Sequence, residues 1–236
     1  MSAPVESVTA TQPGAGGITE RRGPVFIAGA VFLAVFTIAV VVVLVISFTS
    51  GVPTHAVSSG TDSPDAATVS TEGVSLVLPA GWREIPSDDF EVFLARAGDE
   101  HPPLASAFQR ISNVMAEHEF ALFAYRQSTS TDALIDNVNL LVRTSGAVAP
   151  DTLAAAIEQQ LQDTGAHAIV STAITVNGRD ALKMTFQIHT STMRSTVYTT
   201  QYFVFGSDKL AVLTIGTGEP DQGEDAAAIA ESITFD

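Results

Sequence analysis

The sequence predicts an α+β domain, with a mostly antiparallel sheet packed between helices, that follows one transmembrane helix. Three observations carry this prediction. Residues 25–46 form one uninterrupted uncharged run, the hydrophobic period alternates between helix and strand spacing from residue 71 onward, and Asn177-Gly178 separates two β-rich segments. Helices and antiparallel strands in one chain give the α+β class.

Residues 24–48 are predicted to form the transmembrane helix. The apolar run within them is 22 residues long, and as a helix it would span about 33 Å, close to the ~30 Å of a hydrocarbon core. Arg21 and Arg22 precede it, and no Lys or Arg follows before Arg83. The N-terminus is therefore expected in the cytoplasm and the C-terminal domain outside.

The remaining chain divides into three predicted parts. Residues 1–23 read as a disordered cytoplasmic tail, and residues 49–70, rich in Ser, Thr, Gly, Pro and Asp, read as a flexible extracytoplasmic linker. Residues 71–236 are expected to form the exported α+β domain. A signal peptide cleaved near Thr54-His55-Ala56 is the alternative to the anchor, but the apolar core of such peptides is only about 7 to 15 residues long.

The first half of the domain predicts a strand, two helices and two further strands. Val74–Leu78 is a short β-rich run, and Pro79 with Gly81 predicts a turn before Trp82. The other elements are a helix from Ser87 to Gly98, a helix from Pro103 to Met115, and strands at 120–125 and 138–143.

The second half predicts a helix, a four-stranded meander and a terminal helix. The first helix, Asp151–Asp163, places Leu153, Ile157 and Leu161 on one apolar stripe. Asn177-Gly178 is the favoured dipeptide of a tight type I′ hairpin. The strands of the meander are His167–Val176, Ala181–His189, Thr196–Phe205 and Leu210–Ile215, and the terminal helix is Glu224–Ile233.

Composition excludes several functional classes. The 236 residues include 11 basic and 26 acidic side chains, for a formal net charge of −15. A chain this acidic repels phosphate, so nucleic-acid binding is not expected. The chain has no cysteine, which excludes disulfide scaffolds, thiolate metal sites, thiol nucleophiles and lipidation at cysteine.

Polar side chains on one face of the predicted strand Ala181–His189 form the most suggestive binding surface. Hydroxyls, amides, an ammonium and an imidazole on one sheet face are suited to a polyol or a peptide segment, and a solvated sheet face is the alternative. The residues are Lys183, Thr185, Gln187 and His189, with Gln201 and Thr199 of the next strand expected nearby.

Two further residues are candidates for ligand contact. Trp82 is the only tryptophan and follows the first strand, where packing in the core or in a lid is the competing role. Asn139 lies in a predicted strand, where its amide either contacts a ligand or satisfies the fold.

Motifs for catalysis or metal binding are not found in the sequence. Glu117-His118-Glu119 places two carboxylates beside a histidine, but neighbours in sequence do not share a face in a helix or a strand, so a solvated helix end is favoured. No zinc-protease, nucleophile-elbow or phosphate-loop motif occurs in a suitable context. We therefore predict no catalytic residue, no metal and no cofactor.

Four short segments, in a fixed order of elements, carry a family resemblance. They are Leu78-Pro79-Ala80-Gly81-Trp82, Asn137-Val138-Asn139, Asn177-Gly178 and Ser232-Ile233-Thr234-Phe235. With this order, residues 71–236 resemble the PsbP/Mog-like superfamily, in particular the LpqN-type exported proteins of mycobacteria and relatives, and also the DcrB group. The resemblance implies an α/β/α sandwich and a binding, assembly or chaperone-like role without a catalytic motif. This chain lacks the lipidated cysteine of LpqN-type lipoproteins and carries a helical anchor instead.

The expected function is that of a membrane-anchored, extracytoplasmic binding or assembly module of the cell envelope. It would be non-catalytic and would present or scaffold a protein or glycolipid partner. The alternatives are an envelope hydrolase, with a histidine and carboxylates brought together by folding, and a purely structural tethered domain. The membrane is the expected partner of the anchor.

Overall fold

The computed structural model describes residues 65–85, 92, 120–126, 136–144, 149–190, 195–220 and 223–236. The predicted tail, the transmembrane helix, most of the linker and Glu117-His118-Glu119 lie outside this part of the chain, as do the two helices predicted between Ser87 and Met115, except for Val92. Among the described residues, no helix has the length and apolar character needed to cross a bilayer. The anchor at 24–48 therefore stays a prediction.

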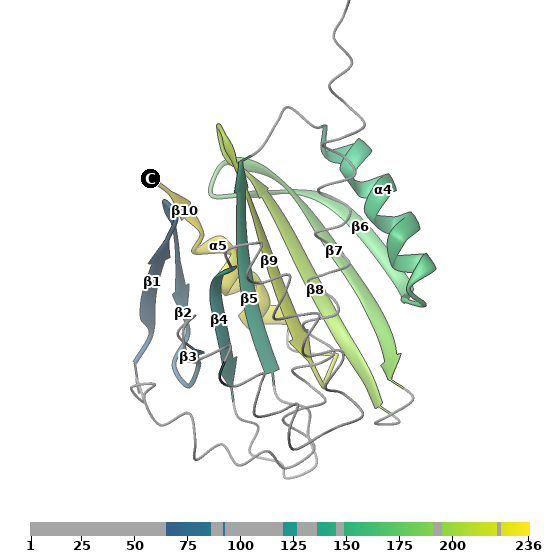
Figure 1. Ribbon diagram of the computed structural model, residues 1–236, viewed down its shortest axis with the longest axis horizontal. Helices are drawn as coiled ribbons and strands as arrows, with labels where there is room; N and C mark the ends of the chain where they lie inside the picture. Colours follow the sequence, from purple (N-terminus) through teal and green to yellow (C-terminus); the bar gives the residue numbers. More distant parts are fainter. Residues whose placement is uncertain are drawn as a thin grey trace, which may run out of the picture.

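The described residues form two antiparallel sheets and two helices, which confirms the α+β class (Figure 1). The larger sheet has seven strands in the order β3-β4-β5-β9-β8-β7-β6, and every neighbouring pair is antiparallel. Its strands are β3 (Arg83–Ile85), β4 (Phe120–Arg126), β5 (Asp136–Thr144), β6 (His167–Val176), β7 (Arg179–Thr190), β8 (Ser195–Phe205) and β9 (Lys209–Thr217). The predicted meander is present as β6-β7-β8-β9, and β5 pairs with its last strand.

The turn between β6 and β7 is the tight hairpin that the sequence predicts. Val176 pairs with Arg179, which leaves two residues in the loop. Asn177 and Gly178 have φ angles of +48° and +74°, as a type I′ turn requires. The Asn177 amide also donates a hydrogen bond of 2.7 Å to the carbonyl oxygen of Ile233, which joins the hairpin to the C-terminal segment.

The smaller sheet corrects two expectations. It has the order β1-β2-β10, with β1 at Ala67–Thr71, β2 at Val74–Leu78 and β10 at Thr234–Phe235. The sequence predicted one sheet, whereas the predicted strand Val74–Leu78 lies in a separate second sheet, where it pairs with both β1 and the chain's last residues. Folded structure also begins at Ala67, inside the segment expected to be linker.

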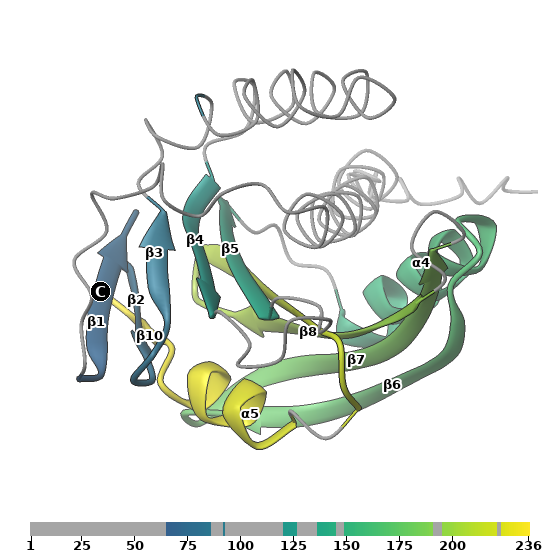
Figure 2. The same ribbon diagram turned by 90° about the horizontal axis from the view of Figure 1, so that it is seen from below.

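The two helices lie on opposite faces of the larger sheet (Figure 2). Helix α4 (Pro150–Asp163) packs on β6 and β7, and helix α5 (Gly223–Glu231) packs on β8 and on β2. Gly165, with φ +84°, ends α4 in a Schellman motif, in which the N–H of Ala166 donates to the carbonyl oxygen of Leu161 at 3.0 Å. The described elements therefore form three layers. Helix α4 is the first, the seven-stranded sheet is the middle one, and α5 with the small sheet is the third.

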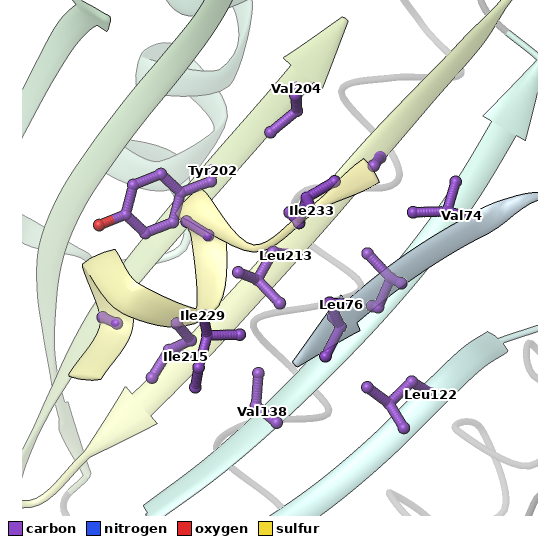
Figure 3. Packing of buried hydrophobic residues seen from close by; sticks show 14 of the residues in the cluster. Val74, Leu76, Leu122, Val138, Tyr202, Val204, Leu213, Ile215, Ile229 and Ile233 are labelled. Carbon is purple, nitrogen blue, oxygen red and sulfur yellow. The ribbon is translucent and has the colours of Figure 1, made fainter. Parts of the chain in front are cut away.

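An apolar core fills the space between α5, the small sheet and the larger sheet (Figure 3). Alternate residues of β5, β8 and β9 contribute Val138, Val204 and Leu213, while α5 contributes Ile229. Burying each such aliphatic side chain contributes roughly 1.5–3 kcal/mol. This layer is therefore a large source of stability among the described elements.

Candidate functional site

Side-chain alternation gives the larger sheet two distinct faces. Leu213, which belongs to the core under α5, defines the α5 face, and every second residue along each strand shares it. Ser171 of β6 hydrogen-bonds to Glu158 of α4 and defines the opposite α4 face. The register of the strands then assigns each candidate residue to one face or the other.

A cluster of neutral polar side chains lies on the α4 face, in the middle of the sheet. Asn139 of β5 is directly opposite Thr214 of β9, which is directly opposite Gln201 of β8. Two residues further along each strand, and therefore on the same face, Asn137 and Thr199 flank Gly216. We call these residues the buried polar cluster: Asn137, Asn139, Thr199, Gln201 and Thr214, all at most 2% exposed.

Most polar side-chain atoms of this cluster have no hydrogen-bond partner among the described residues. Gln201 Nε2 donates to Thr214 Oγ1 at 3.1 Å, but Gln201 Oε1, Thr199 Oγ1 and both amide atoms of Asn137 and Asn139 have no partner in the described part of the chain. A buried polar group without a partner costs about 1–3 kcal/mol. Four side chains with such atoms on neighbouring strands are therefore expensive for the fold, which points to a role other than stability.

Aromatic side chains flank the cluster on the same face. Phe123 lies opposite Asn139, and Tyr125 lies opposite Asn137, both on β4. On the other side, Phe186 of β7 lies opposite Thr199. The cluster is thus a polar centre between apolar rings.

Gly216 leaves the centre of the cluster without a side chain. It lies between Asn137 and Thr199 in continuous strand register, without a bulge. A glycine inside a regular strand often marks a place where a ligand or another backbone comes close to the sheet.

The surface predicted from the alternation in β7 lies on the α5 face, and two of its expected members are not there. The register places Thr185 beside Thr200 and Gln187 beside Tyr198. Gln201 and Thr199 pair with Met184 and Phe186 on the opposite face, so the expected convergence of all six residues does not occur. Successive side chains of a strand point to opposite faces of the sheet, so the face of a residue in β8 depends on how β8 is aligned with β7. The observed register places the odd-numbered residues of β8, including Thr199 and Gln201, on the α4 face.

The remaining members of that surface are partly covered. The Lys183 ammonium lies 5.7 Å from the ring centroid of Tyr202, within cation–π range. Thr185 and Gln187 are half-buried and His189 is exposed. On the α5 face, β7 and β8 thus form a mixed polar surface. Its residues are Lys183, Thr185, Gln187, His189, Tyr198 and Thr200.

Trp82 is a core residue, as the competing interpretation held. It is 4% exposed and belongs to the apolar cluster under α5. The Arg126 guanidinium lies 5.1 Å from its ring centroid, and the indole N–H has no hydrogen-bond acceptor among the described residues.

Arg126 also holds an ion-pair network that the sequence did not reveal. Its guanidinium binds Asp136 at 2.7 Å and also pairs with Asp225 at the N-terminal end of α5. Burial raises the pKa of Asp136 above its ordinary value, although Arg126 acts in the opposite direction. Because Asp225 is far from Arg126 in sequence, no local pattern could have shown this contact.

The buried polar cluster is suited to hydrogen bonding rather than to acid–base chemistry. Amides and threonine hydroxyls do not ionise near neutral pH, so they cannot serve as general acids or bases there. Within the described residues, no group of three His, Cys, Asp or Glu side chains could hold a metal ion. Of the residues predicted from sequence, Asn139, Thr199 and Gln201 belong to this cluster; Asn137 and Thr214 complete it.

Comparison with known proteins finds similar backbones only. The chain matches no protein-family model, and no curated protein is similar to it. A solved structure from Bacteroides thetaiotaomicron is similar over 74% of this chain and 49% of its own length, at 9% identity and a TM-score of 0.44. This chain thus spans about half of that protein.

Two other solved structures belong to groups that the sequence pattern resembles. LpqN of Mycobacterium tuberculosis, described as involved in cell envelope biogenesis, matches over 72% of this chain and 90% of its own, at 13% identity and a TM-score of 0.43. PsbP of the cyanobacterium Synechocystis matches over 75% and 96%, at 10% identity and a TM-score of 0.44. At these sequence identities and TM-scores, the three matches say nothing about the function of this chain.

Proposed function

We propose that the domain is a non-catalytic binding or assembly module of the cell envelope, which presents or scaffolds a protein or glycolipid partner. In this proposal the helix predicted at residues 24–48 holds the domain on the outer side of the membrane. The observation that carries the proposal is the buried polar cluster, whose amide and hydroxyl groups are mostly unpaired within the described part of the chain.

The chemistry of the cluster favours a neutral, hydroxyl-bearing ligand such as the sugar of a glycolipid. Asn137 and Asn139 each offer an acceptor and two donors, and Thr199 offers a hydroxyl that does both. Sugar hydroxyls likewise donate and accept, whereas a phosphate or a carboxylate would favour arginine or lysine. Phe123 and Phe186 beside the cluster supply apolar contact area.

Burial strengthens any hydrogen bond formed there. The cluster is at most 2% exposed, so water does not compete for its donors and acceptors, and the low local dielectric makes each bond stronger. A ligand that pairs these atoms would remove the cost of leaving them unpaired. Affinity and specificity would thus come from the same groups.

The test is a matched pair of substitutions, Gln201→Leu on the α4 face and Gln187→Leu on the α5 face of adjacent strands. The full chain in detergent is titrated with a neutral diglycosyl diacylglycerol, and with phosphatidylcholine as the sugar-free control, while the melting temperature is followed. Ligand binding to the folded state raises that temperature. We expect the glycolipid alone to raise it, in the parent and in Gln187→Leu, and at least tenfold more glycolipid to be needed in Gln201→Leu.

Three results would overturn parts of this proposal. An unchanged melting temperature of the parent would reject the glycolipid ligand. Loss of the effect in Gln187→Leu but not in Gln201→Leu would move the site to the α5 face. Hydrolysis of an envelope ester or glycan by the purified chain, abolished by changing one histidine or carboxylate, would replace the binding module with the hydrolase.

A further inference from the structure

The free edge of β6 is a second feature of the fold, independent of the buried polar cluster. Strand β6 is the last strand of the larger sheet and pairs with β7 on one side only, as far as the described strands extend. Figure 1 shows it at the rim of the sheet, next to α4, which packs on both β6 and β7.

Each face of this strand has side chains that are open to solvent, although α4 packs on one of the faces. Val170 is 57% exposed, and Thr172, Ala173 and Thr175 are also exposed. In the other strands of the meander, by contrast, most residues are buried or half-buried. The side chains of β6 therefore leave its edge accessible from both sides.

The register indicates which backbone groups point outward. Val176 and Arg179 close the two-residue turn, and such residues are joined by the hydrogen bond of the turn. Paired residues in an antiparallel ladder alternate between bonded and non-bonded pairs. Ser171, Ala173 and Thr175 therefore direct their N–H and C=O groups away from β7.

The edge lacks the usual protection against strand pairing. Natural edge strands carry charged residues, prolines or bulges that prevent pairing with another chain. Strand β6 contains no Asp, Glu, Lys, Arg or Pro. Its irregularity lies at the start, between His167 and Val170, where Ala168 has a φ angle of +51°. From Val170 to Val176 the strand is regular.

We propose that this edge pairs with the β6 edge of a second copy of the chain, antiparallel and about a two-fold axis beside Ala173. This pairing aligns Ser171 with Thr175 of the second copy and Thr172 with its Ile174. Both strands are uncharged, so the paired strands themselves bring no like charges together. The chain has a net charge of −15, so its acidic surface repels a second copy. An uncharged strand edge avoids this repulsion between the paired strands. An isologous contact of this kind closes as a dimer.

The first test places a charge on the proposed axis. Ala173→Lys puts two lysines opposite each other in the dimer, while Ala228→Lys makes the same change at an exposed position of α5, on a helix that packs on β8 and β2. Sedimentation of the full chain in detergent over a range of concentrations gives the dimerisation midpoint. We expect a concentration-dependent dimer in the parent and in Ala228→Lys, and a midpoint at least tenfold higher in Ala173→Lys.

The second test uses the absence of native cysteine. Ala173→Cys creates one thiol per chain, and aligned residues of antiparallel strands have Cα atoms about 5.5 Å apart, within the range of a disulfide. Mild oxidation should give a covalent dimer with Ala173→Cys and a monomer with Ala228→Cys. A monomer at every concentration, a dimer unaffected by Ala173→Lys, or equal cross-linking of both cysteine variants would overturn the proposal.

Discussion

The two faces of the seven-stranded sheet differ in what their central residues contribute. On the α5 face, Val138, Leu213 and Val204 lie in an apolar core closed by Ile229 of α5. On the α4 face, the same three strands place Asn139, Thr214 and Gln201 in one row, and most of the polar atoms of the cluster around them are unpaired among the described residues. At their centre these strands thus serve stability on the α5 face and carry groups that oppose it on the α4 face, where the next row of Leu141, Val212 and Phe203 is again apolar and buried.

This difference separates the scaffold from the site. A sheet face that had to provide stability alone would carry aliphatic side chains at Asn139 and Gln201, because each unpaired amide costs about 1–3 kcal/mol. The apolar α5 face can offset that cost. The following changes test each side of the comparison, from the largest expected effect to the smallest.

Leu213→Ala tests the α5 face. Leu213 is fully buried in the core, and truncating such a leucine removes its transfer free energy and leaves a cavity. We expect the free energy of unfolding, measured by urea denaturation of the full chain in detergent, to fall by about 3 kcal/mol. A loss below about 1 kcal/mol would show that the core under α5 is not the source of stability.

Gly178→Val provides a reference that touches neither face. A Cβ at Gly178 would meet no atom within 4 Å, so the expected loss comes from the φ angle of +74° alone. That conformation costs an ordinary residue about 1–2 kcal/mol. If the variant melts at the same temperature as the parent, the assigned turn is wrong.

Asp136→Asn tests the ion-pair network at the edge of the core. Burial raises the pKa of Asp136 above its ordinary value of 3.8. The folded state therefore holds the carboxyl proton more tightly than the unfolded state. The stability that this protonation adds to the fold is fully present below pH 3.8 and is lost as the pH rises through the folded-state pKa.

The expected readout is a difference that depends on pH. As the pH falls from 7 toward 4, the free energy of unfolding of the parent should rise relative to that of Asp136→Asn. A difference that stays constant, or that shrinks on acidification, would show that attraction to Arg126 outweighs the effect of burial.

The sequence predicted best the elements that depend on local spacing. The stripe of Leu153, Ile157 and Leu161 predicted α4, and Asn177-Gly178 predicted the hairpin, because both signals lie within one element or one turn. The small sheet was missed because it joins β2 to Thr234 and Phe235 at the other end of the chain. No local period reports a contact over such a separation.

The site was predicted in part, for a related reason. Alternation within β7 correctly grouped Lys183, Thr185 and Gln187, but the face of Gln201 depends on the register between β7 and β8. A shift of one residue reverses that face. The row from Asn139 to Gln201 also requires β9 to lie between β5 and β8, which the sequence alone does not show.

Asn139→Leu is the measurement that tests the separation of scaffold and site most directly. The change replaces a fully buried amide, whose two polar atoms lack partners among the described residues, with an apolar side chain of similar size. We predict that the free energy of unfolding of the full chain, from urea denaturation in detergent, stays equal to that of the parent or rises by about 1–3 kcal/mol. A fall of about 2 kcal/mol or more would mean that Asn139 holds the fold together, and would contradict the assignment of the buried polar cluster to binding.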